Sequence, residues 1–333
     1  MAITPELNRL DFAVWRHLDN PALGPMNILS DIIRREEISR TNLLTDLRGT
    51  PTIFVASDYG GMHAGASFQS LSFVFVNPEN LLPWDVSRCA LRDRLRLGAR
   101  RISYKALNDG KRRRALFPFL EAANLIPGIL VNVLIDRGVE TTFESKDPIE
   151  LELARSDLFP GWSPVIVERA LRVVHLVSFF LGGLSAPGQD VLWITDEDDI
   201  VANETRLRQL VAVFARISSH YLPHNLRHLR IGTARSDTGR RDLEDLLAIA
   251  DLAAGALQEM VKQQGVPIGA FWLPSPTDLP AKTRSILDWF SDETTFLKRL
   301  VYVLDEDPDS GKLRITSMKF HGTNDLLASR RSH

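Results

Sequence analysis

Apolar and polar residues follow two periodic patterns along this chain. Short runs rich in β-branched and aromatic residues have the pattern of strands, whereas longer segments with apolar residues three and four apart have the pattern of helices. Strands are predicted over 52–57, 67–76, 101–107, 128–136, 190–195, 226–232, 296–304 and 312–320. Helices are predicted over 5–17, 25–48, 111–125, 165–181, 204–218, 242–262 and 283–289.

The order of these elements predicts an α/β fold in which helices cover a mixed sheet. The nearly continuous apolar run 128–136 is typical of a strand that is covered on both faces. Three segments are expected: an N-terminal helical extension over 1–50, an α/β domain over 51–264, and a C-terminal appendage of loop, helix and β-hairpin over 265–333. The acidic turn 305–311 lacks the glutamate of a calcium-binding loop, so a plain hairpin turn is expected there.

One helix carries a carboxylate in an unusual position. The run LLAIADLAAGAL, residues 246–257, is apolar apart from Asp251, and it is too short to span a bilayer. At helical spacing, Asp251 shares a face with mostly small residues, among them Ala254 and Gly255, so another element can approach that face closely. A charge in such a helix needs a partner. A metal ion, an arginine and backbone N–H groups all satisfy that need.

The composition is that of an ordinary globular protein, and it narrows the function only slightly. The 333 residues are 44% hydrophobic and 25% charged, with a net charge of −2, which does not suit a general polyanion binder. The single cysteine, Cys89, excludes an intramolecular disulfide and a cysteine-based zinc site, and it fits a reducing compartment. The sequence shows no secretory signal and no membrane-spanning run. A cytoplasmic protein without a membrane partner is therefore expected.

Positive charge is concentrated in the segment 88–114, with a smaller block at 227–241. Solvated helix faces are one account of such blocks, and nucleic-acid contact is another. Under the second account, one group of side chains would position phosphates. These candidate nucleic-acid-binding residues are Arg100, Arg101, Lys105, Lys111, Arg112 and Arg113.

Acidic residues recur at comparable structural places. Asp58 follows the first predicted core strand, Asp196 and Glu197 follow a later one, and Asp251 lies on a closing helix. Ligands of α/β sheets commonly bind at strand ends, and converging carboxylates repel each other unless a cation lies between them. Oxygen ligands of this kind select Mg²⁺ or Mn²⁺, and two such ions about 4 Å apart support phosphodiester hydrolysis.

Each acidic residue also has a structural interpretation. Asp58 is suited to a turn, Asp251 to a buried salt bridge, and the cluster 196–199 to the N-terminus of the next helix. Within that cluster, Asp198 and Asp199 compete with Asp196 for the role of metal ligand. Among the histidines, His175 lies on an apolar helix and is expected to be a hydrogen-bonded core residue.

Three short motifs together resemble the domain-of-unknown-function 3800 family. They are Asp58-Tyr59-Gly60-Gly61 after a strand, Asp196-Glu197 after a later strand, and ADLAAG, residues 250–255, in a helix. The family shows DESG, DE and ADLxAG at these places, and the resemblance covers about 52–262. It implies a ribonuclease H-like fold, with three antiparallel strands followed by parallel strands. It also implies a magnesium- or manganese-dependent nuclease associated with mobile elements or bacterial defence.

The resemblance carries Asp58, Asp196, Glu197 and Asp251 over as catalytic residues, with Asp58, Asp196 and Asp251 as the metal ligands and Asp237 as a weaker addition. The chain departs from the family pattern at Tyr59, where the family has glutamate. A further acidic residue near the third strand is also missing, and Glu121 is its only substitute nearby.

Two other hypotheses stay open, and the missing glutamate motivates the first of them. In one, the fold persists without catalysis, and the chain is a binding or assembly subunit with a protein partner or a second copy. In the other, the fold is a PIN-like nuclease, whose sheet is parallel throughout. The substrate remains open among DNA, RNA, hybrid and nucleotide.

Overall fold

In the computed structural model, the described residues are 13–19, 24–40, 42–61, 63, 65–139, 159–237, 239–264, 279–292, 295–307 and 309–320. The chain forms two compact units, each built from separate stretches of sequence. The first unit comprises Met1–Ile53 and Val139–Thr233, and the second comprises Phe54–Gly138 and Ala234–His333.

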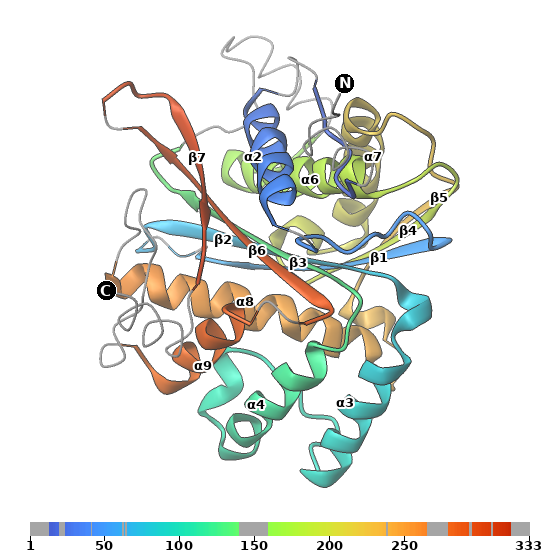
Figure 1. Cartoon of the computed structure of the whole chain (residues 1–333), viewed down its shortest axis with the longest axis vertical. Helices are drawn as coiled ribbons and strands as arrows, with labels where there is room; N and C mark the ends of the chain where they lie inside the picture. Colours follow the sequence, from blue (N-terminus) through green and yellow to red (C-terminus); the bar gives the residue numbers. More distant parts are fainter. Residues whose placement is uncertain are drawn as a thin grey trace, which may run out of the picture. The chain divides into compact units, whose positions relative to one another are not determined.

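The second unit is built on strands that pair in a mixed pattern (Figure 1). Its strands are β1 (Thr52–Gly60), β2 (Phe68–Val76), β3 (Gly128–Asp136), β6 (Leu297–Glu306) and β7 (Leu313–Met318). Pairing is antiparallel between β1 and β2 and between β2 and β3, parallel between β3 and β6, and antiparallel between β6 and β7. The expected mixed α/β sheet is thus confirmed, and a sheet that is parallel throughout is wrong.

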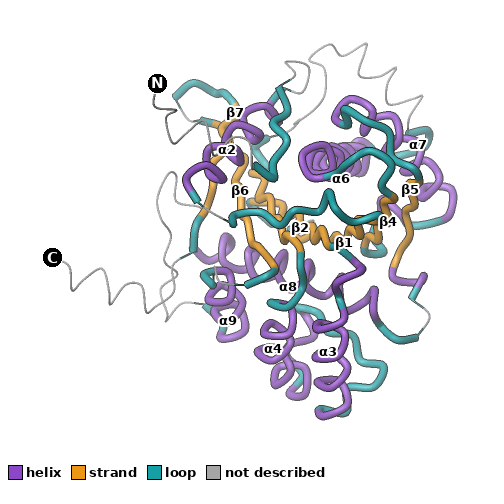
Figure 2. Tube along the Cα trace, turned by 45° about the vertical axis from the view of Figure 1, so that its right-hand side comes forward, coloured by secondary structure: helices purple, strands orange, loops and turns teal. Residues whose placement is uncertain are grey.

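Helices of the second unit cover this sheet. They are α3 (Leu82–Arg94), α4 (Gly110–Ala123), α8 (Asp242–Gln264) and α9 (Ala281–Phe290), and short 3₁₀ turns occur at Pro78–Asn80, Lys105–Asn108 and Ala234–Ser236. The apolar helix α8 packs against β2 and β3, while α9 packs on α8 and α3 lies beside α4 (Figure 2). Because α8 contacts both the sheet and α9, most of its side chains are buried, as its sequence predicts.

The first unit contains a parallel pair of strands and three helices among its described residues. Strands β4 (Asp190–Thr195) and β5 (His228–Thr233) are joined through α7 (Glu204–Tyr221), which is the connection that parallel neighbours require. Helix α6 (Pro164–Leu184) packs on α7, and α2 (Pro25–Ser39) completes the set. Trp15 stacks near Phe179, and a Cβ at Gly183 would lie 2.1 Å from the Trp15 ring, so this position needs glycine.

The local predictions are confirmed for most elements, with four corrections. The predicted strand 101–107 is wrong, because this segment is a loop followed by the 3₁₀ turn Lys105–Asn108. The predicted helix 25–48 ends at Ser39, and residues 13–17 of the predicted helix 5–17 are not helical; its residues 5–12 lie outside the described part. Helix α3 was missed, since Arg88 and Arg92 made its inward face look polar.

The two units cut across the three consecutive segments expected from the sequence. Residues 1–50 group with 139–233, and the C-terminal hairpin groups with 54–138. The physical reason for the second grouping is backbone pairing, because β6 lies in register with β3 along its length, from Gly128 opposite Leu297 to Ile135 opposite Leu304. The hairpin therefore extends the sheet rather than forming an appendage. No helix in the described part of the chain is long and apolar enough to span a membrane.

Candidate functional site

Asp58 lies within β1, two residues before its end, rather than in a turn after it. Its side chain is buried, with 6% of its surface exposed. Cross-strand register places Asp58 opposite Ser72 of β2, and Ser72 opposite Asn132 of β3. Residues directly opposite each other project from the same face of a sheet. Asp58, Ser72 and Asn132 therefore form a buried polar row across three antiparallel strands.

The hydrogen bonds of this row have a fixed direction. The Ser72 hydroxyl donates to the Oδ1 atom of Asn132, and the Asn132 amide donates to the backbone carbonyl of Leu300 at 3.5 Å. Because the carbonyl of Leu300 only accepts, Asn132 must turn its nitrogen toward β6 and its oxygen toward Ser72. The Ser72 oxygen then offers lone pairs, not a proton, to any other neighbour. Such an oxygen beside a carboxylate suits a bound cation.

Helix α8 covers the face from which Asp58 projects. Gly60 shares that face because it is two residues further along the strand. A Cβ at Gly60 would lie 3.4 Å from the carbonyl oxygen of Ala254, and one at Gly61 would lie 2.5 Å from the Gln258 side chain. The two glycines of this motif thus allow α8 to approach the end of β1 closely. Gly61 also has a φ of 74°, a conformation that favours glycine.

Asp251 lies on α8, one turn before Ala254, and is half-buried. Its Oδ2 atom accepts a hydrogen bond from the backbone N–H of Tyr104 at 2.5 Å. Of the three partners that the sequence left open, the structure thus provides a backbone N–H group. Asp58 and Asp251 belong to the same unit. Asp58 lies shortly before Gly60 in β1, and Asp251 lies one turn before Ala254 in α8, so both are close in sequence to the contact between Gly60 and Ala254.

The small face of α8 receives an aromatic ring, as the spacing of its small residues suggested. A Cβ at Gly255 would lie 2.3 Å from the Tyr104 ring. The Tyr104 hydroxyl lies 2.6 Å from Thr283 Oγ1, and the Lys282 ammonium lies 4.2 Å from the ring centre. Burial raises the pKa of Tyr104 to about 12, so this phenol stays protonated. The ring therefore wedges the loop before α4 against α8 and holds its N–H group at Asp251.

Asp196 and Glu197 follow β4 and belong to the first unit, where Asp196 is half-buried and Glu197 exposed. Their neighbours have structural partners. Asp198 accepts a hydrogen bond from Ile200 N and lies 3.6 Å from Arg169 of α6, and Asp199 lies 3.4 Å from the same guanidinium. Burial raises the pKa of Asp198 to about 6 despite this pair. These contacts join Asp198 and Asp199 to α6 and to the 3₁₀ turn that follows them.

The cluster 196–199 was expected to lie at the N-terminus of the next helix. It does begin a helical segment, but that segment is a short 3₁₀ turn and not α7. Asp198 caps the 3₁₀ turn Asp199–Val201, whereas α7 begins after Asn203, whose side chain accepts from Arg206 N. Asp237 likewise acts as a cap. It accepts from the backbone N–H groups of Gly239, Arg241, Leu243 and Glu244. Burial opposes its ionisation, but these bonds outweigh it and hold the pKa of Asp237 below its ordinary value.

A buried ion cluster at the start of α8 was not predicted. Asp245 is 1% exposed and pairs with Arg88 at 3.3 Å and with Arg92, whose Nε lies 2.7 Å from the carboxylate. Arg88 is itself 1% exposed and also bonds Asp85 and Asp242. One signal in the sequence pointed to this cluster. Arg88 and Arg92 lie one helical turn apart, and Asp245 is a second acid in the apolar helix, so each of these charges needs a partner.

The basic segment is therefore divided between buried and exposed charges. Arg88 and Arg92 bind Asp245 and are unavailable to a phosphate. Of the six candidate nucleic-acid-binding residues, Arg112 donates to the carbonyl of Arg101 at 2.7 Å, and both are half-buried. Lys111 is also half-buried. The exposed members lie on the loop before α4 and at its first turn. They are Arg100, Lys105 and Arg113.

Two further sequence candidates have clear environments. His175 is a core histidine, as expected, since its Nδ1 lies 2.8 Å from the Tyr221 hydroxyl and burial lowers its pKa to about 3. Glu121 is exposed on α4. Within the part of the chain that the structure describes, no group of three or more histidine, cysteine, aspartate or glutamate side chains is arranged to hold a metal ion. Comparison of the sequence with protein-family models and with curated proteins finds no match.

Proposed function

We propose that the protein is a divalent-metal-dependent nuclease of ribonuclease H-like type that hydrolyses phosphodiester bonds. The observation that carries the proposal is a carboxylate, Asp58, that is buried near the end of β1 and covered by the helix that bears Asp251. The antiparallel order of β1, β2 and β3 and the parallel pair β4 and β5 support it, because a ribonuclease H-like sheet begins in the same way.

The donor chemistry fits Mg²⁺ or Mn²⁺. Asp58 and Asp251 supply carboxylate oxygens, and the Ser72 oxygen beside Asp58 offers lone pairs only. Asp196 and Glu197 belong to the first unit, and their role as ligands stays a prediction from the sequence. A bound ion of this class activates water and stabilises the leaving oxygen. The chain's own side chains would orient the substrate, with the exposed Arg100, Lys105 and Arg113 binding phosphates.

The test compares conservative variants of the two carboxylates. Asp58→Asn and Asp251→Asn each remove a charge while keeping an oxygen and the side-chain volume. With Mn²⁺, we expect cleavage of labelled single- or double-stranded DNA, RNA or hybrid by the wild type. Each variant should lose at least about 100-fold, equivalent to about 2.7 kcal/mol of barrier. Asp93→Asn, an exposed change on α3, is the matched control. Unchanged cleavage by Asp58→Asn at equal folded yield would disprove the mechanism.

A second candidate is a non-catalytic ribonuclease H-like subunit that acts in an assembly. One observation favours it: Tyr59, which replaces the family's glutamate, has its hydroxyl 2.7 Å from Ser57 Oγ and so supplies no charge. Under this proposal, calorimetry detects no binding of Mn²⁺, and the chain forms a stable complex with another protein or with itself. Binding of Mn²⁺ that is lost in Asp58→Asn argues against this candidate.

A further inference from the structure

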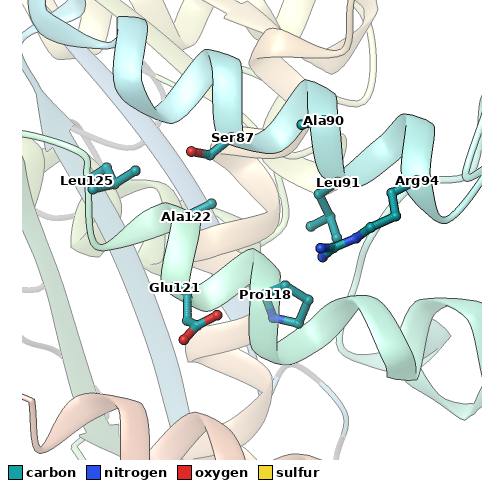
Figure 3. A pocket seen from close by; sticks show the side chains of 8 residues that line it. All are labelled: Ser87, Ala90, Leu91, Arg94, Pro118, Glu121, Ala122 and Leu125. Carbon is teal, nitrogen blue, oxygen red and sulfur yellow. The ribbon is translucent and has the colours of Figure 1, made fainter.

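Helices α3 and α4 enclose an open groove on the second unit (Figure 3). Its volume is about 350 Å³, and Figure 3 shows α3 and α4 running in opposite directions along its two sides. Ser87 and Ala122 face into the gap, and Arg94 extends over it toward Pro118. Ala90, Leu91, Glu121 and Leu125 complete the lining.

Exposed apolar side chains lie beside the groove on α3. On α3, Leu82, Val86 and Ala90 follow one another at intervals of four residues, which places them on one stripe. Leu82 is 71% exposed and Val86 is 60% exposed. Isolated apolar residues on a surface need no explanation, but a stripe beside a groove marks an interaction site.

The stripe ends in positive charge. Arg94 continues the same four-residue spacing after Ala90, and no acidic side chain pairs with it in the described part of the chain. Arg114 lies one turn before Pro118 on α4, and its Nε donates to the carbonyl of Gly110 at 3.3 Å. Because the two helices run in opposite directions, this turn of α4 is at the same end of the helix pair as Arg94. The groove therefore has an apolar end, near Leu82 and Leu125, and a basic end.

This arrangement selects among occupants. A nucleic acid would use the arginines but leave the apolar stripe exposed. A second copy of the chain, related by a two-fold axis, would present the same groove to this one. Each basic end would then face either an apolar end or another basic end, so the arginines would find no acidic partner. The acidic member of the lining, Glu121, points away from α3 and does not change this balance. A small molecule would cover the groove but not the stripe beyond it.

We infer that the α3–α4 groove binds an amphipathic helix of a partner protein that carries acidic residues at one end of its apolar face. Apolar side chains three and four apart on that helix would insert between α3 and α4, as in other helix-in-groove complexes. Its acidic end would pair with Arg94 and Arg114. This surface uses none of the carboxylates of the proposed nuclease site, so the inference stands independently of that function.

The test measures binding of designed helical peptides to the full chain by fluorescence anisotropy. The peptides are about 16 residues long, or about 24 Å as a helix, with leucines at helical spacing. Four peptides are compared. Two carry three glutamates, one peptide at its N-terminal end and the other at its C-terminal end. The other two carry three lysines at the same positions. At least one glutamate peptide should bind. Its lysine counterpart should bind about ten-fold more weakly or worse, a difference of about 1.4 kcal/mol.

Surface variants assign the binding to this groove. Arg94→Glu should weaken the glutamate peptide at least about ten-fold and improve the lysine peptide. Val86→Asp should weaken both. Arg96→Glu makes the same charge change outside the groove, and Val165→Asp changes an equally exposed valine of α6, so both should bind as the wild type does. All four positions are exposed, and circular dichroism verifies that the variants stay folded.

Several outcomes would overturn the inference. Neither glutamate peptide binds, or Arg94→Glu and Arg96→Glu have equal effects. A labelled oligonucleotide displaces the peptide and loses affinity in Arg94→Glu, which assigns the surface to nucleic acid. Sedimentation shows a wild-type dimer that Val86→Asp dissociates, which assigns it to a second copy.

Discussion

Two carboxylates of α8, Asp245 and Asp251, lie in the same apolar helix and have different environments. Asp245 is 1% exposed and lies between the guanidiniums of Arg88 and Arg92. Asp251 is half-buried, and the backbone N–H of Tyr104 donates to it. Two guanidiniums neutralise a buried charge, whereas a peptide N–H group only orients it. A carboxylate that a backbone N–H group holds in place can also coordinate a metal ion.

Burial alone does not identify a functional acid. Asp245 is the more deeply buried of the two, and its role is structural, because it joins the start of α8 to α3. Burial works against the charge of Arg92, but the pair with Asp245 outweighs it and raises the pKa of Arg92. The following predictions test whether the two residues differ as their surroundings indicate.

The largest effect is expected when Asp245 is removed. Asp245→Ala leaves Arg88 buried without its central partner, which costs about 3–5 kcal/mol of unfolding free energy. Urea denaturation followed by circular dichroism measures the loss. Asp242→Ala removes a partly exposed member of the same cluster and should cost about 1 kcal/mol or less. Similar losses in the two variants would contradict the special role of Asp245.

The wedge that holds the N–H group at Asp251 gives the next effect. Gly255→Ala forces a methyl group against the Tyr104 ring, which cannot move freely because Thr283 and Lys282 hold it. Overpacking of this kind costs about 1–3 kcal/mol. Gly110→Ala, at the first turn of α4, meets no atom within 4 Å and serves as the control. Equal thermal midpoints for wild type and Gly255→Ala would show that the Tyr104 contact is loose.

Asp198, in the first unit, allows a pH-dependent test of how arginine partners affect a buried acid. Among the described residues it pairs with one arginine, Arg169, whereas Asp245 pairs with two. Its pKa of about 6 in the folded state exceeds the ordinary value of 3.8, so the folded state binds the proton more tightly. Stability relative to Asp198→Asn should therefore increase as the pH falls from 7 through 6 toward 4, by about 1–3 kcal/mol. Asparagine keeps the cap but not the titration. Parallel stability curves for the two proteins over this range would exclude the shift.

The smallest effect is expected for the stability of Asp251→Asn. Its amide oxygen can still accept the hydrogen bond from Tyr104 N, so the loss should stay below about 1 kcal/mol. Asp251→Leu removes the acceptor and should cost about 1–3 kcal/mol. Chemical denaturation distinguishes these values. A loss in Asp251→Asn as large as that in Asp245→Ala would make Asp251 a structural ion and weaken its assignment as a metal ligand.

Local sequence patterns are enough to predict most of the helices and strands and the apolar character of α8. Periodicity predicted the strands 128–136 and 190–195 and the helix 242–262 nearly to the residue, because alternation and helical spacing reflect which side chains face the core. The small face around Asp251 correctly predicted a close approach by another element. Periodicity failed at 101–107, where Ile102 and Tyr104 are buried from a loop and thus imitate a strand.

Contacts between distant segments of the chain could not be predicted from local sequence. Arg88 and Asp245 are 157 residues apart in sequence, so neither the burial of this pair nor helix α3 around it was visible locally. The same holds for the pairing of β6 with β3 and for the bond from Tyr104 to Asp251. Local conformation depends on neighbouring residues, whereas the partner of a buried charge depends on chain segments that only folding brings together.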